Sequence, residues 1–140
     1  RTGAQVWASQ NRDPAGHSGG LAPIAIDGVP CLALFTALGL CLTRLDPEHA
    51  GEQVAHIPWL TDYLNDIPTP AVLRSRVIIT SRYNQRACAM FAIQLDGTVT
   101  EVWRMRQASG VCSPLVHDEH VYWANKALHC HSRWPPAALG

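Results

Sequence analysis

The chain lacks any excess of charge of one sign. Of its 140 residues, 11 are Lys or Arg and 11 are Asp or Glu, so its formal net charge is zero. Runs of like charge are also missing, and such runs are the electrostatic footprint of proteins that bind nucleic acids or acidic membranes. The sequence therefore predicts no nucleic-acid partner.

Long hydrophobic runs are lacking as well. The longest, residues 29–42, is interrupted by Pro30 and Gly39 and is shorter than the roughly 20 residues of a membrane-spanning helix. It predicts two buried strands, and no transmembrane segment is expected. No charged segment followed by an apolar one opens the chain, which begins at Arg1, so we expect either a removed leader or a fragment, and localisation stays open.

Cysteine motifs are missing too, although the chain has five cysteines. No C-x-x-C pair occurs, which argues against a zinc knuckle and a thioredoxin-like motif. We expect the cysteines to pack as small hydrophobic side chains. One alternative stays open: if residues 32–40 fold back as a hairpin, Cys31 and Cys41 approach, and a disulfide can form in an exported protein. The five are Cys31, Cys41, Cys88, Cys112 and Cys130.

What the chain does contain is an internal repeat. Three segments, residues 21–26, 68–73 and 112–117, each place a proline at the start of a short apolar run. The prolines are Pro23, Pro70 and Pro114, separated by 47 and 44 residues. A period between about 20 and 50 residues is typical of repeat architectures, so it decides the fold before any local prediction.

Each proline segment is followed by a polar turn and by runs rich in β-branched and aromatic residues. Four short antiparallel strands per unit at this period are typical of a propeller blade. The sequence thus predicts an all-β fold, a partial β-propeller of about three stacked four-stranded antiparallel blades. The expected second strands are residues 30–36, 76–81 and 120–124, the third strands 40–45, 87–95 and 127–131, and the fourth strands lie near 53–57 and 99–106.

These runs divide a single partial propeller domain, residues 1–140. With 47% hydrophobic residues, the chain is expected to build a core of normal size. An open set of blades exposes apolar faces and unpaired strand edges, which favour association, so we expect the isolated chain to self-associate. The predicted parts are the end of a preceding blade in residues 1–10, blades in 21–59 and 68–107, and an incomplete blade in 112–134.

A second marker repeats out of phase with the prolines. Residues 2–7 have the form T-G-x-x-x-W, and residues 50–55 repeat it 48 residues later with Ala55 in the tryptophan position. Trp103 occupies that position again after another 48 residues. We expect the glycine to permit the tight turn between the third and fourth strands, and the tryptophan to cover the seam between neighbouring blades.

Residues 62–130, and less closely residues 17–59, resemble the pyrroloquinoline-quinone-like propeller repeat proteins. The resemblance implies a propeller and, by family habit alone, an exported or periplasmic setting. It implies little about function, because the family includes quinone-dependent dehydrogenases, outer-membrane assembly lipoproteins and many members without an assigned role. Arg82, Gln85 and Glu119 stand where the family usually has turn glycines. The resemblance is carried by residues 68–72, 76–81, 83–87, 101–104 and 113–118.

The family's quinone enzymes hold their cofactor over calcium with carboxylate and amide ligands, a stacking tryptophan and often a disulfide between adjacent cysteines. No two cysteines are adjacent here, and Trp59, Asn65 and Asp66 lie where the family looks structural. We therefore expect this chain to bind no cofactor.

A cluster of His117, His120, His129 and His131 around Cys130 suggests a metal site, because His129 and His131 would face the same side of a strand. The stronger interpretation is that residues 117–120 form a solvated hairpin turn. We therefore predict no metal ligands in this chain.

One polar region is expected on loops at one end of a blade, where propellers usually contact ligands. Surface solvation explains these residues equally well. The chain has no G-x-S-x-G, H-E-x-x-H or Walker-type motif, so no catalytic residue is predicted. The candidate ligand-facing residues are Arg82, Tyr83, Asn84, Arg86, Arg104 and Arg106.

The leading hypothesis is a non-enzymatic propeller segment that acts as a binding or scaffold platform for an unidentified protein or small ligand. Two alternatives stay open: a remnant of a quinoprotein oxidoreductase, and a small metal-binding domain that uses the His/Cys cluster.

Overall fold

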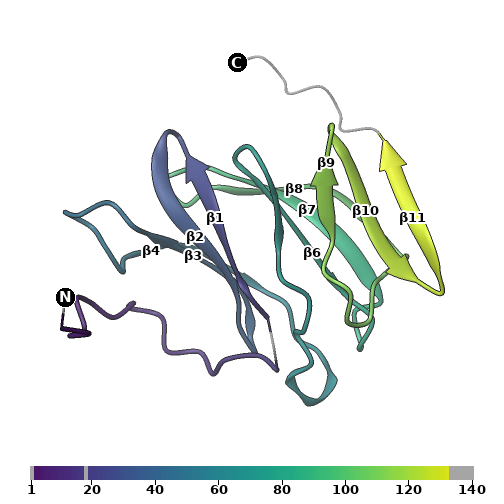
Figure 1. Ribbon diagram of the computed structural model, residues 1–140, viewed down its shortest axis with the longest axis horizontal. Coiled ribbons are helices and arrows are strands. Elements are labelled where there is room, and N and C mark those ends of the chain that lie inside the picture. The colour runs from purple at the N-terminus through teal and green to yellow at the C-terminus, as the bar shows by residue number, and fades with distance from the viewer. Residues whose placement is uncertain (1, 18, 133–140) are drawn as a thin grey trace.

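The chain folds into β-strands almost throughout. The computed structural model describes residues 2–17 and 19–132, and in these ranges it contains eleven strands and one short 3-10 helix, η1 (Asp62–Leu64) (Figure 1). This confirms the all-β prediction. No helix within the described ranges is long and apolar enough to cross a membrane. The strands are β1 (Leu21–Ile26), β2 (Val29–Phe35), β3 (Gly39–Arg44), β4 (Gln53–Pro58), β5 (Ala71–Leu73), β6 (Arg76–Ser81), β7 (Ala87–Ile93), β8 (Val99–Met105), β9 (Leu115–His117), β10 (His120–Asn125) and β11 (Ala127–Ser132).

The strands form three antiparallel sheets that follow one another along the chain. Sheet 1 has the order β1-β2-β3-β4, sheet 2 the order β5-β6-β7-β8, and sheet 3 contains β9, β10 and β11. Within each sheet, every strand pairs with the next strand in sequence. Each run predicted as a strand overlaps a strand of the structure, with bounds that differ by at most two residues; residues 133 and 134 of the predicted last unit lie outside the described residues.

The repeated prolines occupy equivalent places. Each lies in or just before the first strand of its sheet, and in each sheet the hairpin turn begins four residues further on, at Asp27, Arg74 and Asp118. These three turn residues all have positive φ angles, of 49°, 56° and 46°. Two-residue hairpin turns with positive φ match the right-handed twist of the strands that they join. The period found in the sequence is therefore also a period of the backbone.

A β-bulge repeats in the same way. The pairing of β3 with β4 slips by one residue between Leu42 and Thr43, and the pairing of β7 with β8 slips between Met90 and Phe91, 48 residues later. A bulge bends the strand and increases its twist. Sheets 1 and 2 therefore share a local irregularity as well as a strand order.

Gly51 and Trp103 behave as the marker predicts, and Gly97, which the marker did not include, takes the equivalent turn in sheet 2. Gly51 and Gly97 lie in the turns before β4 and β8, with φ angles of 92° and 89°. Trp103 packs against the apolar cluster between sheets 2 and 3, so it covers a seam between neighbouring sheets. The first copy of the marker differs, because Trp7 covers no seam between the described sheets and its side chain is 42% exposed.

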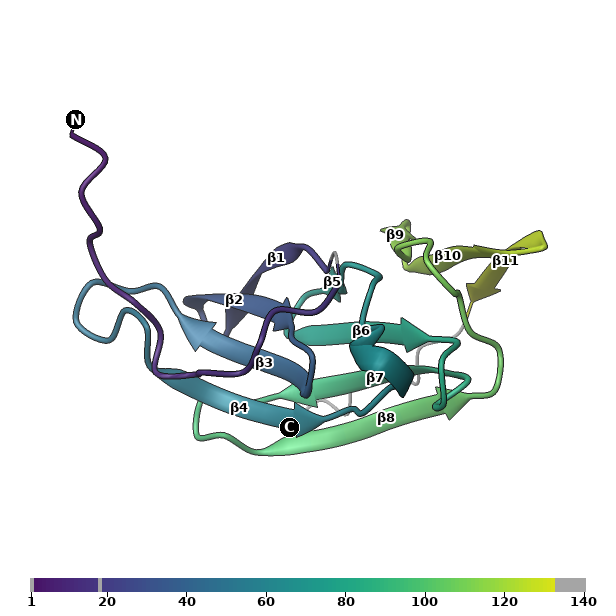
Figure 2. The same cartoon turned by 90° about the horizontal axis from the view of Figure 1, so that it is seen from below.

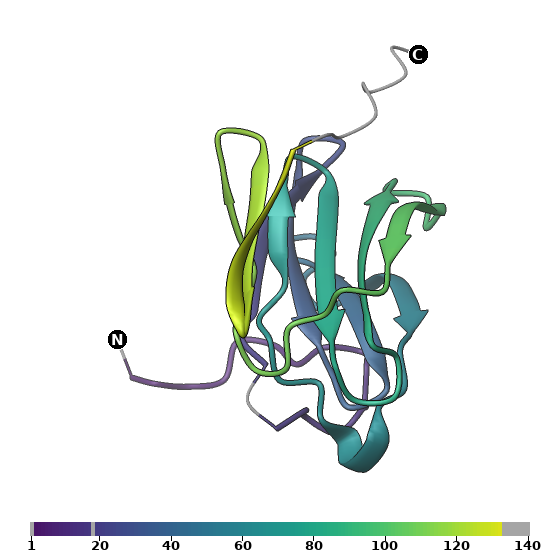
Figure 3. The same cartoon turned by 90° about the vertical axis from the view of Figure 1, so that its right-hand side faces the viewer.

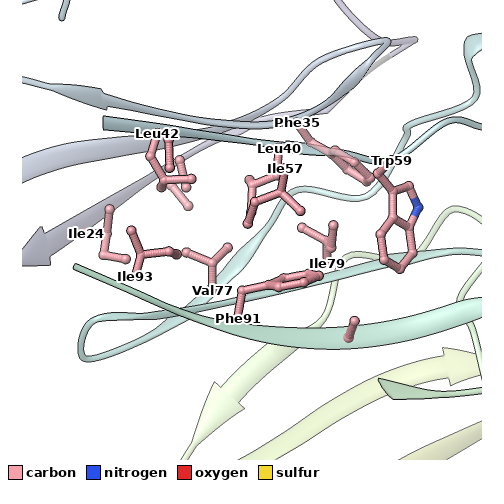
Figure 4. Packing of buried hydrophobic residues seen from close by; sticks show 14 of the residues in the cluster. Ile24, Phe35, Leu40, Leu42, Ile57, Trp59, Val77, Ile79, Phe91 and Ile93 are labelled. Atoms are coloured by element: carbon pink, nitrogen blue, oxygen red, sulfur yellow. The ribbon is translucent and has the colours of Figure 1, made fainter. Parts of the chain in front are cut away.

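The first of two apolar cores lies between sheets 1 and 2 (Figure 4). The strands of sheet 1 contribute side chains to this core, and so does Trp59, the residue after β4. The Trp59 ring meets Phe91 edge-on, with centroids 6.4 Å apart. These residues alternate along each strand, as expected when one face of the sheet is buried. The labelled members are Ile24, Phe35, Leu40, Leu42, Ile57 and Trp59 on one side, and Val77, Ile79, Phe91 and Ile93 on the other.

The second core lies between sheets 2 and 3 and uses the opposite set of alternating residues. Ile78 and Met90 of sheet 2 meet Val121 and Trp123 of sheet 3, and all four side chains are 0% or 1% exposed. Sheet 2 is therefore buried on both faces. Figure 3 shows the three sheets one behind another along the line of sight.

The cysteine predictions are partly wrong. The hairpin of β2 and β3 forms, but its register places Cys31 opposite Arg44 and Cys41 opposite Leu34, so the proposed Cys31–Cys41 disulfide does not form and both thiols are free. Cys88 is buried like these two, as expected of packed small hydrophobic residues. Cys112 and Cys130, in contrast, are exposed free thiols.

Truncating Phe91 tests the first core. Phe91→Ala should lower the free energy of unfolding by about 3–5 kcal/mol, because it removes a buried ring and leaves a cavity beside Trp59. Val111→Ala, at a residue that is 64% exposed, is the matched control and should change stability by less than about 0.5 kcal/mol. Urea unfolding followed by tryptophan fluorescence measures both; equal effects would contradict the packing described for sheets 1 and 2.

Candidate functional site

One end of the three sheets collects nearly all of the buried polar groups. Because the strands alternate in direction, the β2–β3 turn, the β6–β7 turn and the links in residues 59–70 and 106–114 all meet at this end, which we call the loop end. The link that contains η1 lies at the bottom of Figure 3. Among the buried polar residues of the described chain, Thr43 alone lies away from the loop end. The others are Thr36, Thr61, Asp66, Thr80, Ser81 and Ser109.

The structure brings the predicted ligand-facing residues to this same end. Four of them belong to the turn between β6 and β7, and the other two lie at the end of β8, where Met105 pairs with Cys88 beside that turn. The positive φ angles of the turn fall on Asn84 and Arg86, not on the two residues expected to replace glycines, Arg82 and Gln85. The predicted residues are Arg82, Tyr83, Asn84, Arg86, Arg104 and Arg106.

Arg104 is engaged in packing. Its guanidinium lies 4.6 Å from the ring centre of Trp59, and its Nη2 donates to Glu101 Oε2 at 2.8 Å. A cation over an indole face is an attractive contact, and the Glu101 carboxylate holds the guanidinium in place. Arg104 thus closes the open end of the first core.

The other three arginines of the set remain available. Arg82, Arg86 and Arg106 are exposed, and none of them forms an ion pair with another residue in the described ranges. Gln85, between two of them, donates from Nε2 to the carbonyl of Leu60 at 2.9 Å and so ties the turn to the neighbouring link. The loop end of sheet 2 therefore presents uncompensated positive charge on an anchored turn.

Asp66 is a second unusual group at the loop end, and no pattern in the sequence pointed to a function for it. Its side chain is 0% exposed, and neither carboxylate oxygen has a well-formed hydrogen bond within the described chain. Burial raises the pKa of Asp66 to about 7, and the nearby Thr61 hydroxyl offsets only part of this rise. Asp66 is therefore close to half protonated at neutral pH.

Two glycines explain why Asp66 is covered. A Cβ atom on Gly16 would lie 2.7 Å from the backbone oxygen of Asp66, and one on Gly19 would lie 3.0 Å from the backbone oxygen of Phe35. Only glycine lets the backbone approach this closely. The N-terminal segment can therefore lie directly on the link that carries Asp66.

A polar bridge fastens the same segment to sheet 1. Asp13 Oδ2 lies 2.8 Å from Thr36 Oγ1, which can donate to it, and 2.7 Å from His56 Nε2. Burial alone would raise the pKa of Asp13, but its hydrogen bonds with Thr36 and His56 outweigh this and lower it overall. Cys41 stands opposite His56 in the sheet, yet it is 0% exposed and burial raises the pKa of its thiol. A buried thiol of raised pKa is a poor nucleophile, so this set is structural.

The histidine cluster is dispersed. His129 and His131 do face the same side of β11, as predicted, but both stack on Trp123, with ring centroids 6.1 and 4.5 Å away. Cys130 lies between them and faces the other side of the strand. Residues 117–120 form the hairpin turn between β9 and β10. No three His, Cys, Asp or Glu residues of the described ranges are arranged to hold a metal ion.

Asp66 predicts an unusual dependence of stability on pH. Because the pKa of about 7 in the folded chain exceeds the value near 3.8 of a free carboxyl, folding takes up a proton between these values. The contribution is fully present below about pH 4 and lost as the pH rises through 7, by up to about 4 kcal/mol.

Asp66→Asn should therefore remove most of the stability loss between pH 5 and pH 8. Urea unfolding at the two pH values measures it. Asp62→Asn, at an exposed residue of the same link, is the control and should keep the wild-type slope. An unchanged slope in Asp66→Asn would show that Asp66 does not titrate in this range.

In comparisons with known proteins, no family model, no curated protein and no solved structure matches this chain.

Proposed function

We propose that this chain is a segment of a β-propeller of the pyrroloquinoline-quinone-like repeat type, and that it acts as a non-enzymatic binding platform. The arrangement of the first strands carries the proposal. β1, β5 and β9 lie next to one another, one from each sheet, while the fourth strands β4 and β8 lie along the other side (Figure 2). Sheets that meet along their first strands are expected of blades around a central channel.

Polar contacts between successive first strands support this arrangement. The backbone N–H of Gly20 donates to Thr69 Oγ1 at 3.0 Å, and the N–H of Thr69 donates to Ser113 Oγ at 2.9 Å. At the opposite end, the hairpin turns of sheets 2 and 3 are joined by an ion pair of 2.7 Å between Arg74 and Glu119. Sheets 2 and 3 thus make polar contacts at both ends of their inner edges.

The ligand-facing part of the platform is the positively charged turn at the loop end. Arg82, Arg86 and Arg106 offer guanidinium groups with no ion-pair partner among the described residues, and guanidinium pairs best with carboxylate and phosphate groups. A platform of this kind recognises a protein or small ligand through anionic groups. It needs no reacting residue.

The quinoprotein alternative receives no support from the described contacts. A quinone needs an open tryptophan face and available carboxylates, and here Trp59 is 1% exposed under Arg104 and Phe91. The carboxylate of Asp66 is fully covered. We therefore retain the non-enzymatic platform as the proposed function.

Binding of a fluorescent oligoglutamate peptide, followed by anisotropy at low salt, tests the platform. The double variant Arg82→Ala/Arg86→Ala should weaken binding about tenfold, because it removes two unpaired charges. Arg74→Ala/Arg76→Ala removes the same charge from the same sheet at its other end and should change the affinity less than about twofold.

Equal losses in the two double variants, or no peptide binding by the wild-type chain, would contradict the assigned surface. A parallel titration with pyrroloquinoline quinone and calcium should give no saturable signal. Stoichiometric quinone binding would instead favour the oxidoreductase alternative.

A further inference from the structure

The N-terminal arm, residues 2–8, carries the sequence of a fourth strand. Gln53-Val54-Ala55 in β4 and Glu101-Val102-Trp103 in β8 both sit at the repeated bulge, 48 residues apart, and Gln5-Val6-Trp7 precedes the first of these by another 48. The arm also contains Gly3, whose φ of 73° resembles that of the turn glycines before β4 and β8. By sequence and by its glycine conformation, the arm resembles the start of β4 and of β8, the fourth strands of sheets 1 and 2.

The arm nevertheless pairs with no strand in the described structure. It has no regular secondary structure, and Val6 is 91% exposed. Trp7 and Ala8 already lie against Gly51, since a Cβ atom on Gly51 would come within 3.2 Å of the Trp7 ring and 2.9 Å of the Ala8 backbone oxygen. From Gln10 onward the segment is hydrogen-bonded to sheet 1, through the N–H of Gln10, which donates to the carbonyl of Gly51 at 2.9 Å, and through the Asp13 bridge. The arm is thus an unpaired apolar strand sequence on an anchored base.

Sheet 3 offers the matching edge. β3 and β7, the third strands of sheets 1 and 2, each pair with a fourth strand, but β11 has no neighbour on its outer edge among the described residues. The outer face of sheet 3 is also apolar and open, because Leu115 and Leu128 are 63% and 74% exposed. An exposed strand edge beside an apolar face is a template for strand addition.

We propose that the arm of one copy of this chain adds to β11 of a second copy as its fourth strand. The occupant is a second copy because the N-terminal segment and β11 lie on opposite sides of the molecule (Figure 1). The inference rests on the proposed function, since it extends the repeat from one copy into the next.

The pairing within sheet 2, the neighbour of sheet 3, predicts the register of the added strand. In sheet 1 the register differs, because Ala55 pairs with Leu42, which pairs with Ala33, six residues after Asp27. Trp103 pairs with Met90, which pairs with Ile78. Ile78 and Tyr122 are equivalent, since each lies four residues after the first residue of its hairpin turn, and Tyr122 pairs with Cys130. Cys130 therefore takes the place of Met90, and the residue equivalent to Trp103 should stand directly opposite it.

In the arm that residue is Trp7. A side chain opposite Cys130 projects from the outer face of sheet 3, because facing residues of an antiparallel pair point to the same side. There Trp7 would lie beside Leu128, two residues from Cys130 on the same face of β11, as Trp103 covers the seam between sheets 2 and 3. The register turns the proposal into a prediction about one pair of residues.

Cross-linking with a single new thiol tests this pair. In Trp7→Cys, exposure to oxidised glutathione should join the introduced thiol of one copy to Cys130 of another by a disulfide, because facing β-carbons lie about 5 Å apart. Peptide mass spectrometry of the covalent dimer identifies the pair. Cys112 is the internal control, since it is also an exposed free thiol but lies outside sheet 3. Tyr63→Cys, at a residue that is 88% exposed, is the control for random collision.

A noncovalent measurement complements it. The wild-type chain should associate with rising concentration in sedimentation velocity, and Val6→Asp should weaken association about tenfold or more, because the charge would be buried against sheet 3. The arm packs in neither core, so this variant should keep the wild-type unfolding midpoint.

Three outcomes would overturn the strand exchange: a monomer at every concentration, a cross-link within one copy, or linkage to Cys112 as frequent as linkage to Cys130. Each of these would leave anion binding at the loop end untouched, because that is measured on a different surface. Loss of peptide binding with an intact cross-link would instead overturn the platform alone.

Discussion

The structure depends on the burial of both faces of sheet 2. Alternating residues of β6 and β7 point in opposite directions, so Val77 and Ile79 enter the first core while Ile78 and Met90 enter the second. A shift of one residue would exchange the two faces of a sheet, and burial prevents this only where one face is apolar and the other polar. Here both faces are apolar, and the register is held instead by the two-residue hairpin turn, by the bulge and by Trp103 at the seam.

The two ends of the sheets differ in their turns and in their polar groups. The hairpin ends carry short turns and exposed ion pairs, which contribute little stability. The loop end carries the long links, and there backbone and side-chain polar groups must be covered without a strand ladder to satisfy them. Asp66 is the consequence: its pKa of about 7 reflects a carboxyl enclosed by close glycine contacts with too few partners. The unpaired arginines lie at the same end, on an anchored turn beside this crowded polar region.

Periodic features of the fold could be predicted from the sequence because they depend on local chemistry. The spacing of Pro23, Pro70 and Pro114 located every first hairpin, and the 48-residue marker located the fourth strands and the position of Trp103. Contacts set by register and by chain crossing could not be predicted in this way. The alternative of a Cys31–Cys41 disulfide is wrong because the turn of a hairpin sets which residues face each other, and here it places Arg44 opposite Cys31. Burial of Asp66 and the Asp13–His56 bridge depend on where the N-terminal segment crosses, and no local pattern records that path.

Two segments that share the marker take different conformations in this chain, and the difference has a physical cause. Residues 50–55 and residues 2–7 share the marker, yet the first group begins β4 while the second forms no strand. β-propensity is a weak preference that depends on neighbours, because a strand is stabilised by its ladder and by cross-strand side chains. β4 has β3 beside it, whereas the arm has no third strand within reach in its own copy. The arm should therefore form a strand only where it can pair with an open strand edge. β11 has such an edge, since no strand pairs with its outer side in the described chain.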